Sequence, residues 1–231
     1  MVDIFDEINE DLRAERARLL LKRYGGLLLA ALVLVLLGIG GWQAWRWREA
    51  GQAGQNAALF LDAMRKAAPA AAGLDTATPA RTEALAGFDS LAASAPDGYR
   101  TLARLRAASL KVSAGDRPGA LALLDRVSAD TAADPLLRGL ADLLWVQSEV
   151  DEGDPAAVEG RLAGLLVPGN AWRPMAMEAQ AWLLMRTNRE NQARTVLKEL
   201  QAEPMAPDGV KGRAVWLLSR LGEPAAPGTG G

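Results

Sequence analysis

Residues 84–91 read ALAGFDSL, and their pattern of a small residue followed by two larger apolar ones returns three more times along the chain. The pattern recurs as ALALLDRV at 120–127, VEGRLAGL at 158–165 and ARTVLKEL at 193–200, in steps of 36, 38 and 35 residues. Side chains at offsets of 0, 4 and 7 share one face of a helix. The sequence therefore predicts four helices that present equivalent faces in a repeat architecture.

Turn signals and chain breakers divide the sequence into units around these helices. Short turn signals stand at residues 114–116 (AGD), 152–154 (EGD), 187–190 (TNRE) and 221–223 (LGE). Breakers rich in proline, glycine and aspartate stand at residues 96–98, 134–135, 169–174 and 204–209. Each unit is thus expected to be a first helix, a tight turn, a second helix and a looser connection. No stretch after Trp47 shows the alternation typical of a strand, so the predicted fold class is all-α.

Units of 34 to 38 residues with this plan resemble tetratricopeptide (TPR) repeats, in which a small residue on the second helix lets the first helix approach closely. The tryptophan, glycine and tyrosine of the consensus first helix are absent here. The resemblance implies a TPR-like α-solenoid over residues 81–222.

Flanking segments extend this plan on both sides. Residues 46–80 are expected to hold a helix from Glu49 to Ala72, with Leu59, Phe60, Ala63 and Met64 on one side, and a linker to Arg81. That helix would serve as the first helix of the first repeat. Residues 223–231, EPAAPGTGG, are expected to form a disordered tail.

An apolar run, GGLLLAALVLVLLGIGG, occupies residues 25–41. No charged residue occurs from Tyr24 to Trp45, and those 22 residues would span about 33 Å as a helix. This length matches a bilayer hydrocarbon core of about 30 Å. We therefore expect a transmembrane helix over residues 24–45.

Both ends of this run carry residues typical of a membrane interface, where aromatic rings and long cationic side chains gather. These membrane-interface residues are Lys22, Arg23, Tyr24, Trp42, Trp45, Arg46, Trp47 and Arg48. A buried core helix and a cleaved signal peptide remain alternatives. Against a signal peptide, the run is longer than a typical apolar region and bulky residues follow it where a cleavage site should stand.

Basic residues favour one orientation of the span. Five lie within residues 1–23, and fewer follow the span closely, so the amino terminus is expected in the cytoplasm and the larger part of the chain on the far side. Within residues 1–23, Ile4, Ile8 and Leu12 form an apolar stripe on an amphipathic tail. This tail would either dock a partner protein or lie against the lipid headgroups.

Composition excludes several classes of chemistry. The chain contains neither cysteine nor histidine, which removes thiol and imidazole nucleophiles, histidine acid–base catalysis and the usual zinc ligands. No catalytic motif or phosphate-binding loop is present, so no enzyme activity, catalytic residue, metal or cofactor is expected. With a formal charge of −2, the chain lacks the basic excess that nucleic-acid binding needs.

A repeat solenoid does offer a binding surface, because its stacked first helices line a groove. On this groove we consider the cations Arg100, Arg104 and Lys111, which could meet a peptide carboxylate, together with Trp182 and Trp216, which occupy equivalent positions in successive repeats. The alternative is that the cations form a solvated face and that the tryptophans pack between helices.

An amphipathic tail ending in KRYG, one apolar span and a small TPR-like array together resemble the bacterial ancillary SecYEG translocon subunit family, also called YfgM-like. The resemblance covers residues 1 to about 222. It implies a single-pass inner-membrane protein with a cytoplasmic amino terminus and a periplasmic helical domain.

The same resemblance implies partners and a role in protein export. The partners are the SecYEG translocon, a membrane-anchored periplasmic chaperone of the prolyl-isomerase type, newly exported polypeptides and membrane lipid. A membrane-anchored scaffold of another envelope assembly, in cytochrome maturation or in the cell envelope and division machinery, remains the alternative.

Overall fold

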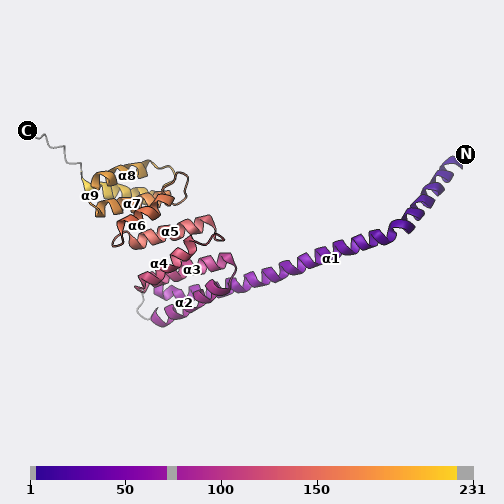
Figure 1. The fold of residues 1–231 in the computed structure, drawn as a ribbon, viewed down its shortest axis with the longest axis horizontal. Helices are drawn as coiled ribbons and strands as arrows, with labels where there is room; N and C mark the ends of the chain where they lie inside the picture. Colours follow the sequence, from indigo (N-terminus) through magenta and orange to yellow (C-terminus); the bar gives the residue numbers. More distant parts are fainter. Residues whose placement is uncertain (1–3, 72–76, 223–231) are drawn as a thin grey trace, which may run out of the picture. The chain divides into compact units, whose positions relative to one another are not determined.

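The computed structural model describes the backbone of residues 4–71 and 77–222 and the side chains of residues 26, 29–43, 45–48, 51–68 and 79–222. Over these residues the chain forms nine helices and no strand (Figure 1). The helices are α1 (Ile4–Ala71), α2 (Ala77–Ser94), α3 (Asp97–Ser113), α4 (Arg117–Ser128), α5 (Pro135–Glu149), α6 (Pro155–Leu165), α7 (Arg173–Arg186), α8 (Glu190–Ala202) and α9 (Asp208–Leu221). The all-α prediction is therefore confirmed.

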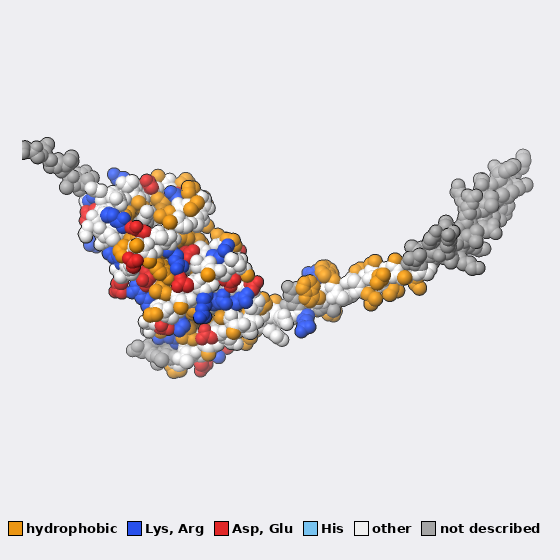
Figure 2. All heavy atoms as spheres, in the orientation of Figure 1, with side chains coloured by type: hydrophobic (Ala, Val, Ile, Leu, Met, Phe, Trp, Pro, Cys, Tyr) orange, Lys and Arg blue, Asp and Glu red, His pale blue; other side chains and the backbone are white. Residues whose placement is uncertain are grey.

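The chain divides into two units, Met1–Gln55 and Asn56–Gly231. In the first, α1 is long and apolar enough to cross a bilayer. Its apolar side chains lie on the surface, as the orange atoms along the helix in Figure 2 show, with Leu34 70% and Leu37 66% exposed. Such exposure does not fit a core helix of this chain, because large apolar patches on soluble surfaces are rare.

Several of the predicted interface residues lie at the end of this apolar stretch. Trp42, Trp45 and Trp47 are all more than half exposed, and the Arg46 guanidinium lies 4.8 Å from the centre of the Trp42 ring. The side chains of Lys22, Arg23 and Tyr24 lie outside the described residues, as do those of Ile4, Ile8 and Leu12 and the whole of the 223–231 tail.

In the second unit, consecutive helices pack as pairs that stack in chain order (Figure 1). The first helices α3, α5, α7 and α9 also contact one another in sequence. The second helices α2, α4, α6 and α8 carry the repeated pattern of a small or slender residue followed by two large apolar ones.

All twelve residues of the repeated pattern are buried, with exposed fractions of 2% or less. They are Ala84, Phe88 and Leu91; Ala120, Leu124 and Val127; Val158, Leu162 and Leu165; and Ala193, Leu197 and Leu200. The predicted register is therefore confirmed in every repeat. Small or slender side chains at the first position of each pattern allow neighbouring helices to approach closely.

Local chemistry explains the turns between the paired helices. Gly115 and Asn188 have φ angles of 79° and 57°, the left-handed conformation that glycine and asparagine adopt most readily. The carboxylates of Asp116 and Asp154 then accept hydrogen bonds from backbone N–H groups in the first turns of α4 and α6. The predicted turn signals thus end one helix and begin the next.

The first repeat differs from the prediction in two details. Ala63 and Ala67 of α1 are buried against α2, and Phe60 and Met64 pack beside them, but Leu59 is 57% exposed. Helix α2 begins at Ala77, so residues 77–80, which were predicted as the end of the linker to Arg81, are helical. Leu59 lies beside the apolar stripe of α1, which follows the 60, 63, 64 and 67 positions, and it lines a shallow hollow between α1 and α2 instead of packing in the core.

Candidate functional site

The candidate site is the surface formed by the first helices α3, α5, α7 and α9, which we call the first-helix face. Two cavities lie along it, and the exposed side chain of Gln147 on α5 lines both. We name them the Trp182 cavity and the α3–α5 cavity. Together they provide the hollowed surface that the sequence predicts for a solenoid.

The Trp182 cavity has a volume of about 560 Å³ and collects side chains from three first helices. Its lining residues are Gln147, Val150 and Asp151 at the end of α5, Met175, Glu178, Ala179 and Trp182 on α7, and Arg213 on α9. Trp182 is 40% exposed, so part of its indole ring is open to solvent. The cavity therefore combines an aromatic surface with charged groups.

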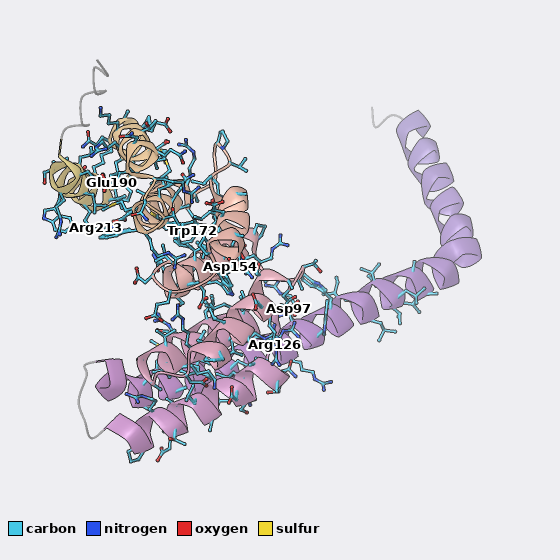
Figure 3. All side chains as sticks on the ribbon, turned by 60° about the vertical axis from the view of Figure 1, so that its left-hand side comes forward. Asp97, Arg126, Asp154, Trp172, Glu190 and Arg213 are labelled. Atoms are coloured by element: carbon cyan, nitrogen blue, oxygen red, sulfur yellow. The ribbon has the colours of Figure 1, made fainter. Side chains whose placement is uncertain are left out.

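One ion pair joins α7 to α9 at this cavity. The Arg213 guanidinium, labelled in Figure 3, donates from Nε to Glu178 Oε1 at 2.5 Å and from Nη2 to Glu178 Oε2 at 2.7 Å. This two-point contact raises the pKa of Arg213 through the Glu178 hydrogen bonds. Asp151, by contrast, forms no ion pair with any residue that the structure describes.

The α3–α5 cavity is smaller, about 400 Å³, and more apolar. Its lining residues are Ala108, Ser109, Val112 and Ser113 on α3, Leu124 on α4, and Leu144, Gln147 and Ser148 on α5. Val112 is 48% exposed at this position. A cavity of this composition suits an aliphatic side chain better than a charged one.

The three predicted cations of α3 all form ion pairs within the chain. Arg104 Nη1 lies 2.9 Å from Asp130 Oδ2, Lys111 Nζ lies 2.7 Å from Asp116 Oδ2, and Arg100 pairs with Asp97. The Lys111 ammonium and the Gly119 N–H group lower the pKa of Asp116. The Arg104 and Lys111 pairs join α3 to the loops around α4, whereas the Arg100 pair lies within α3. A role of the three cations in partner binding stays a prediction.

The two predicted tryptophans have different surroundings. Trp182 lines the cavity described above, whereas Trp216 is 51% exposed on α9 and has the Arg220 guanidinium 5.1 Å from its ring centre. Trp145 occupies the equivalent place on α5, four residues before the end of the helix, and the Arg161 guanidinium lies 4.4 Å from its ring centre. The structure brings Trp182 alone of these three into a described cavity.

Sequence reasoning did not identify four polar lining residues of the Trp182 cavity as binding residues: Gln147, Asp151, Glu178 and Arg213. The sequence did contain one indication of the Glu178–Arg213 pair, because these two residues are 35 positions apart, which is one repeat length. Opposite charges one repeat apart on first helices can pair across neighbouring units. Gln147 and Asp151 offered no such signal.

Among the side chains that the structure describes, no group of three or more acidic residues is placed to hold a metal ion. The charged side chains of the Trp182 cavity either form an ion pair between helices, as Glu178 and Arg213 do, or lie exposed without an ion-pair partner among the described residues, as Asp151 does. The chemistry that this face supports is recognition by shape, aromatic contact and charge.

Comparison with known proteins identifies the family of this architecture. A family model described as a tetratricopeptide repeat-like domain matches residues 19–206, most of the chain and including its apolar stretch. No curated protein and no solved structure matches. Domains of this kind are typically protein-interaction modules without catalytic activity. With its buried repeat register and paired helices, the chain belongs to the tetratricopeptide repeat-like domain family.

Proposed function

We propose that this protein is a non-enzymatic adaptor of the bacterial inner membrane that associates with the SecYEG translocon and assists newly exported polypeptides. Its α1 segment would anchor the chain by a single span, with the amino terminus in the cytoplasm and the repeat domain in the periplasm. A membrane-anchored chaperone of the prolyl-isomerase type would be a further partner. The first-helix face would provide the contact with polypeptide.

The observation that carries the proposal is the exposed apolar segment of α1 in a chain that also holds a TPR-like domain. From Leu29 to Ile39, all large apolar side chains are 47% to 70% exposed. A bilayer would cover them, since burying apolar area is favourable by about 25 cal/mol per Å². The exposed Trp42 and its Arg46 neighbour then match the composition of a membrane interface.

The association with the export channel rests on the resemblance of the whole plan, namely tail, span and TPR-like array, to the ancillary translocon subunit family. Two hollows on one face support the role of the array, because a protein-interaction module needs a surface into which a partner can insert side chains.

Co-purification tests this function. The full chain would be extracted from membranes in mild detergent after crosslinking through a photoreactive amino acid, placed either at Gln147 on the first-helix face or at Lys198, which is exposed on α8. We expect translocon components among the partners, and exported polypeptides crosslinked from position 147 in preference to 198. Recovery of a different envelope complex with no Sec component would refute the translocon proposal and favour the alternative scaffold.

Topology can be tested separately, because the natural chain has no cysteine. A Lys198→Cys variant should react in intact cells with a maleimide that crosses only the outer membrane. A single cysteine placed within residues 1–23 should react only after the inner membrane is opened. The reverse labelling pattern, or a soluble protein, would refute the proposed anchor and its orientation.

A further inference from the structure

The charged side chains that line the Trp182 cavity carry a net negative charge. Two carboxylates, Asp151 and Glu178, and one guanidinium, Arg213, line it. Glu178 is 13% exposed and receives both hydrogen bonds of Arg213. Asp151 lies on the exposed turn after α5 and pairs with no other described residue. The cavity therefore presents one uncompensated negative charge.

The tryptophan in this cavity also differs from its two counterparts. At the equivalent positions of α5 and α9, Arg161 lies over Trp145 and Arg220 lies over Trp216. No such cation from the described part of the chain lies over Trp182. An indole face attracts a cation placed within about 6 Å of its centre. The face of the Trp182 ring is therefore open to a cation from a ligand, whereas arginines of the chain itself cover the rings of Trp145 and Trp216.

Next to this cavity, Gln147 and the α3–α5 cavity provide two further contacts. The Gln147 amide forms no hydrogen bond with the residues that the structure describes, so its donor and acceptor are both open to a ligand. Beyond it, Val112 and Leu144 line a hollow suited to an aliphatic side chain. The first-helix face thus offers an apolar hollow, a free amide and a site for a cation next to one another, which suits an extended polypeptide.

We propose that the first-helix face binds an extended polypeptide segment whose arginine or lysine side chain enters the Trp182 cavity. The cation lies between the Trp182 ring and the Asp151 carboxylate. A neighbouring aliphatic side chain of the same segment fills the α3–α5 cavity, and Gln147 pairs with the backbone amide between them. This inference rests on the proposed function of the face as a polypeptide-binding surface, and it specifies the chemistry that the face selects.

Synthetic peptides test this selectivity directly. The probes are fluorescently labelled twelve-residue glycine–serine peptides that carry one leucine and one arginine, two to six residues apart. Each has a partner in which citrulline, which is uncharged and nearly isosteric, replaces arginine. Binding to the full chain in mild detergent is measured by fluorescence anisotropy. With the best spacing, we expect the arginine peptide to bind about tenfold more tightly than its citrulline partner.

Matched variants test whether the preference for arginine over citrulline arises in the Trp182 cavity. Asp151→Asn keeps the shape of a side chain that forms no hydrogen bond or ion pair with the described residues, and Trp182→Leu removes the aromatic ring. Each variant should bring the arginine preference to about twofold or less. Asp89→Asn removes an equivalent exposed charge from α2, and Trp216→Leu removes the ring at the matching position of α9. Both control variants should keep the full preference.

Three results would overturn the inference: equal binding of arginine and citrulline peptides, no binding of any peptide, or an arginine preference that persists in Asp151→Asn. Asp151→Asn is not expected to disturb folding. That variant therefore still decides the test if Trp182→Leu fails to fold. Equal binding of both peptides would leave polypeptide binding itself intact. The association with the translocon depends on co-purification instead, so the two proposals fail separately.

Discussion

Replacing Gly139 by alanine should destabilise the repeat domain, although alanine is the better helix former. Gly139 lies in α5, where a Cβ atom would stand 2.7 Å from Cδ1 and 3.0 Å from Nε1 of Trp172 (labelled in Figure 3). Favourable contacts between heavy atoms need about 3.5 Å or more. The indole ring would have to move, yet its Nε1 donates a hydrogen bond to the Leu136 carbonyl at 2.9 Å.

The opposing contributions can be compared. Overpacking at a closely packed contact costs about 1–3 kcal/mol, and loss of the Trp172 hydrogen bond about 1 kcal/mol more. Alanine in place of a helical glycine returns about 1 kcal/mol. We therefore expect Gly139→Ala to lower the free energy of unfolding by about 1–3 kcal/mol.

Urea unfolding of the full chain in detergent, followed by far-ultraviolet circular dichroism, measures this change from the midpoint at a common slope. Gly160→Ala is the matched control, because Gly160 is an exposed glycine within α6 whose added Cβ would meet nothing within 4 Å. This control should stabilise the domain by about 0.5–1 kcal/mol.

The same substitution in a Trp172→Leu background tests whether the Trp172 ring causes the loss of stability. If the Trp172 ring is the obstacle, Gly139→Ala should become neutral or stabilising once Trp172→Leu has removed that ring. Stabilisation by Gly139→Ala in the natural background, equal to that of Gly160→Ala, would refute the reasoning. So would an undiminished loss of stability in the Trp172→Leu background.

Three further predictions concern packing and charge. Ala193→Leu, at a fully buried position, should lower the free energy of unfolding by about 1–3 kcal/mol in the same urea assay, and a neutral effect would contradict close helix packing there. Because Lys111 and a backbone N–H group lower the pKa of Asp116, the folded state gains stability above the usual carboxyl range and loses it as the pH falls below about 4. Asp116→Asn should therefore weaken the fall in melting temperature between pH 5 and about pH 3, and an unchanged acid dependence would show that this pair contributes nothing. Arg161→Lys should cost about 1 kcal/mol, measured by urea unfolding, because lysine cannot pair with Asp125 and Asp142 at once while covering Trp145; an unchanged midpoint would refute that role.

Much of the fold could be predicted because the relevant signals are local in sequence. Offsets of 4 and 7 along a helix define a face, so Ala84, Phe88 and Leu91 were recognisable as a buried set before any contact was known. Turn chemistry at Gly115 and Asn188 is local too, because it depends on the φ angle of a single residue.

The site was less predictable, because its parts come from different repeats. Trp145, Trp182 and Trp216 hold equivalent sequence positions, yet only the packing of their neighbours decides which ring is covered by an arginine and which lines a cavity. In the same way, Arg100, Arg104 and Lys111 read as free cations in sequence, whereas each meets a carboxylate in the folded chain.

The sequence by itself determined the helical class, the repeat register and the presence of one stretch apolar enough to span a membrane, since each depends on residue type and spacing along a single helix. The tertiary structure decided which charges neutralise each other and where the hollows open on the first-helix face. Those outcomes depend on how closely and at what angle residues about one repeat apart approach, and helix packing sets both.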